Sequence, residues 1–161
     1  MADLIEIGAM SEENYALAAE IEAECFSDNP WTLNQFHEEL SLDFSRTFIA
    51  YLDGEAAGFV NMWLTPPLAI INNIAVRADR RRLGIGALLM QRAIDECGEC
   101  SSLSLEVRVS NSAAISFYDG FGFTQVGLRK NFYSNPKEDA YIMTKFKKKD
   151  TDKSGDSGAD G

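Results

Sequence analysis

The chain has 161 residues, 45% of them hydrophobic and 25% charged, which is ordinary for one globular domain with a sizeable core. No apolar run approaches the ~20 residues that span a membrane, and the opening residues MADLIEIGAM carry acids where a signal peptide has basic residues. The formal net charge of −10 disfavours nucleic acid as a partner. We therefore expect a cytoplasmic protein that binds neither membrane nor nucleic acid. Its acidity either attracts a basic peptide or serves solubility alone.

The first half of the chain predicts a strand, two helices and a hairpin. Ser11 is the predicted N-cap of the first helix, and Thr32 with Gln35 three residues later forms a capping-box pattern for the second. Asp53-Gly54 is typical of a tight hairpin turn. The predicted elements are a strand at 4–7, helices at 11–25 and 32–42, and hairpin strands at 48–52 and 56–64.

The second half predicts four strands and two helices. Pro66-Pro67 breaks the chain before a nearly continuous apolar run, which is typical of a central strand. Asn111 is the predicted cap of the last helix, and Gly122 at its end suits a left-handed backbone. The predicted elements are a strand at 68–76, a helix at 84–97, a strand at 103–109, a helix at 111–121, and strands at 123–128 and 140–146.

This order of elements predicts an α/β fold, a mixed sheet with helices packed on it. We expect one domain at 1–146 and a polar tail at 147–161, which lacks the apolar residues needed to fold and is expected to be disordered.

The histidine and the cysteines form no metal or nucleophile pattern. Cys97 and Cys100 make one CxxC at the end of a predicted helix, where the helix dipole opposes a thiolate, and no second CxxC completes a zinc site. We expect them to be two small residues in a helix-to-strand turn. His37, the only histidine, falls on an apolar helical stripe and is expected at the edge of the core. No metal is predicted.

Residues 80–90 read RRRLGIGALLM, three arginines and two glycines at the start of a predicted helix. A helix N-terminus presents unpaired N–H groups and partial positive charge, which suit phosphate. Gly84 and Gly86 leave room beside the backbone, and arginine donors suit phosphate. A P-loop would need a Lys after the glycines, and a dinucleotide fingerprint would need Gly at Leu89. The stretch predicts a phosphorylated cofactor, and the alternative is a glycine-rich helix entry with a solvated basic turn.

The same stretch resembles the Q/R-x-x-G-x-G/A motif of the GCN5-related N-acetyltransferase (GNAT) superfamily. The resemblance implies a GNAT fold over 1–146, with a mostly antiparallel mixed sheet flanked by helices. It implies that the loop binds the pyrophosphate of acetyl-CoA and that the preceding strand binds the pantetheine arm through its backbone. The implied cofactor-binding residues are Asn73, Ile74, Ala75 and Val76 of the strand, and Arg81, Arg82, Leu83, Gly84, Ile85 and Gly86 of the loop.

A longer match covers residues 105–123, LEVRVSNSAAISFYDGFGF. They resemble the pattern L-E-V-R-x-S-N-x-x-A-I-x-x-Y-x-x-x-G-F of RimI-type enzymes, a GNAT subgroup. Weaker matches lie at 29–32, 129–133 and 139–143. The resemblance implies transfer of an acetyl group from acetyl-CoA to the N-terminal alanine of a small-subunit ribosomal protein, the one numbered eighteen. It also implies that Asn111 contacts the pantetheine arm.

The chemistry of amide formation matches these residues. An N-terminal amine has a pKa of about 7.7–8.0, against about 10.4 for lysine, so it needs only modest help to lose its proton. Glu106, on the strand face opposite Leu105 and Val107, matches the subgroup's general base, acting directly or through water. Tyr118 matches its general acid, which protonates the leaving thiolate. No cysteine is placed for an acyl-enzyme, so we expect direct attack in a ternary complex.

Each candidate also has a structural interpretation. Glu106 is alternatively a solvent-facing strand carboxylate, and Tyr118 a core aromatic. Trp31 either lines the peptide groove or staples the second helix to the sheet. Tyr133 and Asp139 are expected to help hold the peptide. The alternative functions are a GNAT enzyme acting on lysine or a small amine, and a non-catalytic acyl-CoA-binding module.

Overall fold

The computed structural model describes residues 4–147. The predicted tail therefore lies, except for Lys147, outside the described residues. No helix in the described range is long and apolar enough to cross a membrane. The elements are β1 (Ile5–Ala9), α1 (Tyr15–Cys25), α2 (Leu33–Glu39), β2 (Ser45–Leu52), β3 (Glu55–Thr65), β4 (Leu68–Val76), the short 3₁₀ helix η1 (Ala78–Arg80), α3 (Ile85–Glu96), β5 (Ser102–Arg108), α4 (Ser112–Gly120), β6 (Thr124–Tyr133) and β7 (Glu138–Phe146).

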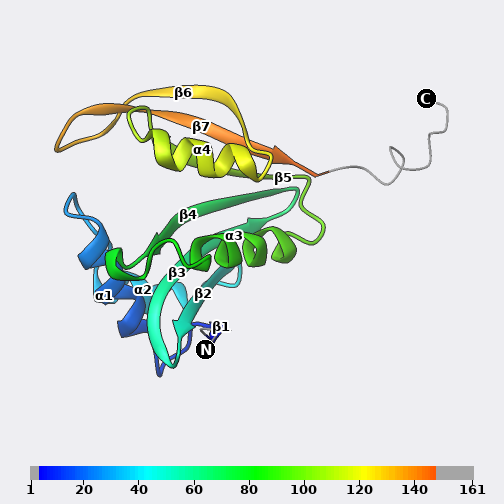
Figure 1. Ribbon diagram of the computed structural model, residues 1–161. Helices are drawn as coiled ribbons and strands as arrows, with labels where there is room; N and C mark the ends of the chain where they lie inside the picture. Colours follow the sequence, from blue (N-terminus) through cyan, green and yellow to red (C-terminus); the bar gives the residue numbers. More distant parts are fainter. Residues whose placement is uncertain (1–3, 148–161) are drawn as a thin grey trace.

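The strands form one seven-stranded sheet in the order β1-β2-β3-β4-β5-β7-β6 (Figure 1). Neighbouring strands are antiparallel except for β4 and β5, which are parallel. The nearly continuous apolar run forms β4, which lies in the middle of the order. These features confirm the predicted α/β class and the mixed, mostly antiparallel sheet.

Helices cover both faces of the sheet, and each face has its own core. Leu89 and Met90 of α3 pack with Phe123 in the larger core, which also receives side chains of α4. On the other face, Ile21 of α1 and Phe36 of α2 pack with residues of β2 to β4. Successive side chains of β2 point to opposite faces of the sheet, so they contribute to both cores. This explains the apolar run within β2.

Local signals in the sequence set several of the boundaries. Thr32 accepts a hydrogen bond from the Gln35 amide, and the Gln35 side chain accepts one from the Thr32 amide, so the capping box is present. Asn111 caps α4 by accepting from the Ala114 amide at 3.1 Å. Asp53 and Gly54 both have positive φ, 50° and 88°, as the two central residues of a type I′ turn require. These predictions are confirmed.

Other boundaries differ from prediction. The first helix begins at Tyr15 with Asn14 as N-cap, because Ser11 is in a local turn. The Ser11 hydroxyl accepts from the Glu13 amide, and the Asn14 side chain accepts from the Ser11 amide at 2.7 Å. Such side-chain bonds compete with a helix start. The second helix ends at Glu39 rather than at 42, and β6 continues to Tyr133 rather than 128.

The CxxC lies in the predicted helix-to-strand turn. The Cys100 amide donates to the Cys97 carbonyl at 2.9 Å, just after α3 and before β5. Burial is the main reason that the pKa of the Cys97 thiol rises to about 11. The thiol is therefore protonated near neutral pH, which fits a packing role.

The sheet opens between β4 and β5. Within residues 4–147, the two strands pair only where Leu68–Ile70 meets Ser102–Ser104. Beyond this point β4 stays paired with β3 as far as Val76, and β5 stays paired with β7 as far as Arg108. Figure 1 shows the upper part, α4 with β5 to β7, diverging from the lower part. Each strand therefore keeps an edge that no strand covers.

Candidate active site

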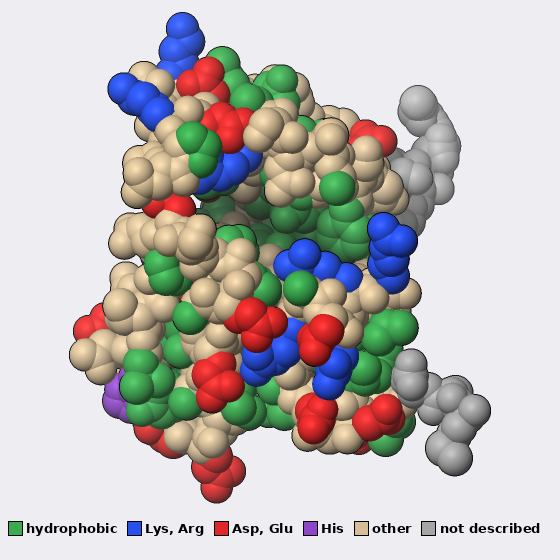
Figure 2. Space-filling view, turned by 60° about the vertical axis from the view of Figure 1, so that its left-hand side comes forward, with side chains coloured by type: hydrophobic (Ala, Val, Ile, Leu, Met, Phe, Trp, Pro, Cys, Tyr) green, Lys and Arg blue, Asp and Glu red, His purple; other side chains and the backbone are tan. Residues whose placement is uncertain are grey.

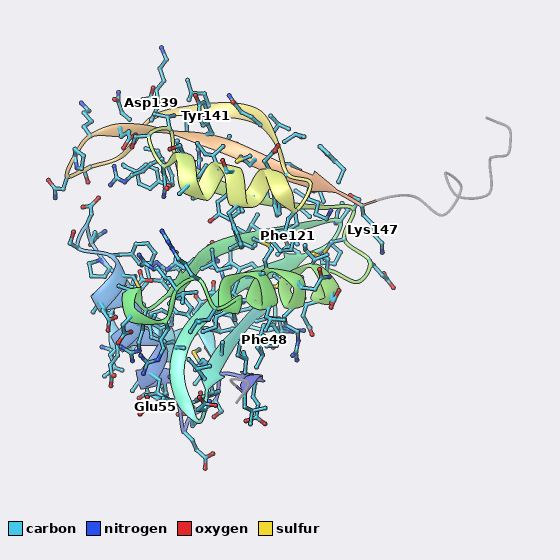
Figure 3. The ribbon with its side chains drawn as sticks, viewed as in Figure 1. Phe48, Glu55, Phe121, Asp139, Tyr141 and Lys147 are labelled. Carbon is cyan, nitrogen blue, oxygen red and sulfur yellow. The ribbon has the colours of Figure 1, made fainter. Side chains whose placement is uncertain are left out.

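A groove crosses the molecule where β4 and β5 diverge. Figure 2 shows it between the upper and lower parts, with hydrophobic side chains on its floor and Lys or Arg side chains at its lower edge. The open edge of β4 includes residues 73–76, the predicted pantetheine-binding segment. Figure 3 shows Phe121, just past α4, in the space between α4 and α3. The groove thus brings α4 and the start of α3 to the edge of β4.

The predicted phosphate loop ends at the N-terminus of α3. Gly84 is the N-cap, at φ 87°, and no side chain caps the helix there. A positive φ favours glycine, and the absence of a capping side chain leaves the first amides of α3 without that partner. A Cβ on Gly86 would lie 3.7 Å from Phe117 and 3.8 Å from Val76. Protein packing therefore leaves room at Gly86, and the loop fits an anion.

The three arginines of this loop differ in the hydrogen bonds and ion pairs that their side chains form. Arg80 pairs with Glu55 at 2.9 Å and with Asp79 at 3.1 Å, and it lines a separate pocket of about 420 Å³ near the β2–β3 turn. Arg81 donates from Nε to the Val76 carbonyl at 3.0 Å. Arg82, at φ 67°, forms no ion pair in the described part of the chain. Of these three arginines, only Arg80 is held by carboxylates within residues 4–147, and the phosphate contacts of Arg81 and Arg82 stay predictions.

Glu106 lies on β5 as predicted, between the buried residues Leu105 and Val107 and on the opposite face. Its Oε2 accepts a hydrogen bond from Nη1 of Arg129 on β6 at 2.7 Å. The side chains of Glu106 and Arg129 are 32% and 53% exposed. The carboxylate is therefore accessible and ion-paired, as the alternative of a paired strand carboxylate expects, and its role as a base stays a prediction.

Tyr118 lies on α4 and is buried among aromatic rings, with its centroid 5.6 Å from that of Phe117 and 5.9 Å from that of Phe123. Burial is the main cause that raises the pKa of Tyr118 to about 12, and the neighbouring Tyr133 contributes less. Burial is also the main cause that raises the pKa of Tyr133 to about 12, and Glu106 contributes less. Tyr133 thus lies close enough to affect Tyr118, and Glu106 lies close enough to affect Tyr133, so Tyr133 on β6 links the two predicted catalytic residues of β5 and α4.

Two other predicted residues have structural contacts. Trp31 precedes the Thr32 N-cap, and its ring lies 5.4 Å from that of Phe36, four residues into α2. This is a hydrophobic staple, although the Trp31 side chain stays partly exposed. Asp139 accepts from the Asn131 amide at 2.8 Å and so holds the β6–β7 hairpin; Figure 3 shows it at the top of that hairpin. Its peptide-binding role stays a prediction.

Asn111 retains donors beyond its cap. Its Oδ1 accepts from the Ala114 amide, while its Nδ2 has no hydrogen bond among residues 4–147. A cap of α4 that keeps a free amide group is able to contact a ligand in the groove. The pantetheine contact of Asn111 stays a prediction.

No pattern in the sequence assigns a role to Arg108 or Arg129. Arg108 on β5 pairs with Asp28 before α2 at 3.3 Å and with Glu138 on β7 at 3.2 Å, and it stacks over the Tyr133 ring at 4.3 Å. It thus joins the α1–α2 loop to the β6–β7 hairpin across one end of the groove. Partners 80 residues apart leave no local signal in the sequence.

Comparisons with known proteins agree with this fold. The model of the acetyltransferase (GNAT) family matches residues 12–123. A Bacillus subtilis protein, named provisionally as a ribosomal protein bS18-alanine N-acetyltransferase, is 40% identical over 127 residues, covering 77% of this chain and 83% of its own. The Escherichia coli K12 protein named as ribosomal protein bS18-alanine N-acetyltransferase is 36% identical over 121 residues, covering 71% and 79%.

A crystal structure of the ribosomal-protein-S18-alanine N-acetyltransferase from Escherichia coli superimposes with a TM-score of 0.81 at 31% identity, covering 89% of this chain and 94% of that one. The family match spans most of the described chain, and the matches cover 79% to 94% of the lengths of the named relatives. The fold, the groove and these similarities agree. The chain therefore belongs to the acetyltransferase (GNAT) family and is an acetyl-CoA-dependent N-acetyltransferase.

Proposed function

We propose that this enzyme acetylates the N-terminal alanine of a small-subunit ribosomal protein, bS18, by direct attack of the amine on acetyl-CoA. The relatives named for this substrate support the proposal. The observation that carries it is that Glu106 lies on β5, one of the two strands that border the groove, with its side chain 32% exposed. A ribosomal substrate puts the reaction in the cytoplasm.

The residues of the groove fit acetyl-CoA. The open edge of β4 at 73–76 offers backbone groups to an extended arm, and the α3 amides after Gly84 offer donors to phosphate. Arg82 adds a charged donor, and the Asn111 amide a polar one. The cofactor supplies the acetyl thioester, whose acyl carbon accepts the amine. The chain's own residues supply the remaining chemistry.

Glu106 takes the amine proton in this proposal. An N-terminal amine with a pKa of about 7.7–8.0 is partly neutral at pH 7, so a carboxylate in reach is sufficient as a base. The Arg129 guanidinium holds one oxygen of Glu106. The other oxygen is then oriented toward the amine or a water molecule.

Tyr118 provides the proton for the leaving thiolate. With a pKa raised to about 12, chiefly by burial, the phenol stays protonated near pH 8, where about half or more of the N-terminal amine is neutral. The same burial that raises the Tyr118 pKa makes a thiolate in the groove more basic, because desolvation disfavours both anions. In this proposal the leaving thiolate accepts the proton of the Tyr118 phenol.

Two peptides test the substrate. One has a free N-terminal alanine and no lysine, and the other has a blocked N-terminus and an internal lysine. We expect acetylation of the first only, detected as a gain of one acetyl group by mass spectrometry. Acetylation of the blocked peptide alone would replace the proposed substrate with lysine. Binding of acetyl-CoA with no acetylation of either peptide, or of small amines, would favour the non-catalytic module.

A further inference from the structure

The last turn of α1 contains a buried carboxylate that the proposed reaction does not use. Glu22 is 3% exposed. Its Oε1 accepts from Nδ2 of Asn73 on β4 at 3.0 Å, and its Oε2 accepts from the backbone N–H of Trp31 at 3.0 Å. One side chain of α1 therefore joins the strand next to the groove to Trp31, two residues before α2.

The contact is specific in its geometry. Each carboxylate oxygen has its own donor, and the two donors come from elements 42 residues apart in the sequence. Three residues further along α1, the Cys25 thiol donates to the Val76 carbonyl at 3.4 Å. The end of α1 thus contacts β4 at Asn73 and at Val76, the two ends of the predicted pantetheine-binding segment.

Burying the Glu22 carboxylate costs free energy, so close packing alone does not explain why a carboxylate occupies this position. Desolvation outweighs both hydrogen bonds and raises the pKa of Glu22, because a buried charge loses its hydration. An apolar side chain of similar size would avoid this cost but would leave the Trp31 amide without an acceptor. The arrangement therefore favours a role in holding Trp31, whose side chain stays partly exposed.

We propose that Glu22 is a positioning residue of the acetyl transfer, which fixes Trp31 against residues 73–76 of β4 so that the peptide meets the cofactor in a fixed geometry. This role rests on the proposed function. Positioning of this kind lowers the barrier because the reacting groups are already oriented. Loss of Glu22 should therefore weaken peptide binding more than cofactor binding, since the sheet itself holds β4 through its pairing with β3.

Three variants separate positioning from stability. Glu22→Met keeps the size of the side chain and removes both acceptors. Glu22→Gln is the conservative variant, because its oxygen accepts from Trp31 and its amide donates to Asn73 after the Asn73 amide turns over. Glu39→Met is the matched control. Glu39 is also a buried carboxylate, and it accepts from Ser45, Asn61 and Trp63 but from neither Trp31 nor Asn73.

The kinetic test measures kcat and both KM values with the alanine peptide and acetyl-CoA. We expect Glu22→Met to raise the peptide KM about tenfold, with the acetyl-CoA KM changing less than about twofold, as for the loss of one or two hydrogen bonds. Glu22→Gln should restore the peptide KM. Glu39→Met should lower the melting temperature and leave the peptide KM unchanged.

A second measurement does not depend on activity. The chain has two tryptophans, so a Trp63→Phe background leaves Trp31 as the only indole fluorophore. In that background we expect Glu22→Met to shift Trp31 emission to the red and to increase its quenching by acrylamide, while Glu22→Gln has neither effect. If wild-type protein acetylates no peptide, the proposed function fails, and this signal still tests whether Glu22 positions Trp31.

The proposal is overturned if Glu22→Met lowers stability without changing the peptide KM or the Trp31 signal. It is also overturned if Glu39→Met raises the peptide KM to the same extent, because any buried carboxylate of this layer would then have the same effect.

Discussion

At the level of single residues, Glu106 and Tyr118 differ in burial and in the groups that surround them. Glu106 is accessible, and its carboxylate pairs with Arg129. Tyr118 is buried among rings, and its pKa rises to about 12, mainly through burial. A base must accept a proton and an acid must hold one. The roles that the resemblance implied for Glu106 and Tyr118 stay predictions, and one variant tests each of them.

Replacing the carboxylate of Glu106 tests the base. Glu106→Gln should lower kcat about 10²–10⁴-fold, the usual contribution of a general base, because the amide cannot accept the amine proton. Acetyl-CoA affinity measured by calorimetry should not change. Glu55→Gln is the control, since Glu55 also pairs with an arginine, Arg80, but away from the groove. An unchanged kcat in Glu106→Gln would leave Glu106 as a paired surface carboxylate.

Replacing the hydroxyl of Tyr118 tests the acid. Tyr118→Phe keeps the ring contacts with Phe117 and Phe123, so the melting temperature should change little. The value of kcat should fall about 100-fold, within the range for a lost general acid. A variant with full kcat would show that Tyr118 is a core aromatic and that another group, or water, protonates the thiolate.

At the scale of elements, the divergence of β4 and β5 creates the site. Local patterns predicted the strands, the Thr32 and Asn111 caps and the Asp53-Gly54 turn, because these depend on neighbours in the sequence. The limited pairing of Leu68–Ile70 with Ser102–Ser104 has no such signal, because it depends on residues more than 30 positions apart. The partners of Glu106 and Arg108, which lie 23 to 80 positions away, were also unpredictable from local patterns. The motifs identified the residues of the site, and the fold determines which of them share a region.

The loop before α3 provides a matched pair of arginines. Arg82 is free of ion pairs in the described range, whereas Arg80 is held by Glu55 and Asp79. Arg82→Ala should weaken acetyl-CoA binding about tenfold, a change of about 1.4 kcal/mol that is typical of a hydrogen bond to a charged group. The effect should shrink at high salt. Equal losses in Arg82→Ala and Arg80→Ala, measured by calorimetry, would argue against this assignment.

At the level of the whole molecule, one sheet with a hydrophobic core on each face forms a single folded unit. Its α/β class was predictable from the order of the elements in the sequence. Burial within this unit also sets its response to alkali. The pKa of Cys97 rises from 9.0 to about 11, chiefly through burial. The unfolded chain releases this proton at lower pH than the folded chain. The contribution of the Cys97 thiol to the free energy of unfolding is therefore fully present below pH 9 and is lost as the pH rises toward 11.

Urea unfolding across this range checks the effect. The midpoint for the wild-type protein should fall between pH 9 and pH 11, with a further fall toward pH 12, where Tyr118 and Tyr133 have raised pKa values of about 12. In Cys97→Ala the fall between pH 9 and pH 11 should be smaller. A midpoint that stays constant over this range would contradict the assigned burial of these groups.

In the proposed reaction, the groove between β4 and β5 holds acetyl-CoA beside Glu106 and Tyr118. A crystal structure with coenzyme A and an alanine-terminated peptide would show whether it does. We expect the pyrophosphate on the amides of residues 84–87, the pantetheine arm along residues 73–76, and the peptide amine nearest to Glu106. Coenzyme A bound elsewhere, or a peptide amine remote from both Glu106 and Tyr118, would contradict the proposed site.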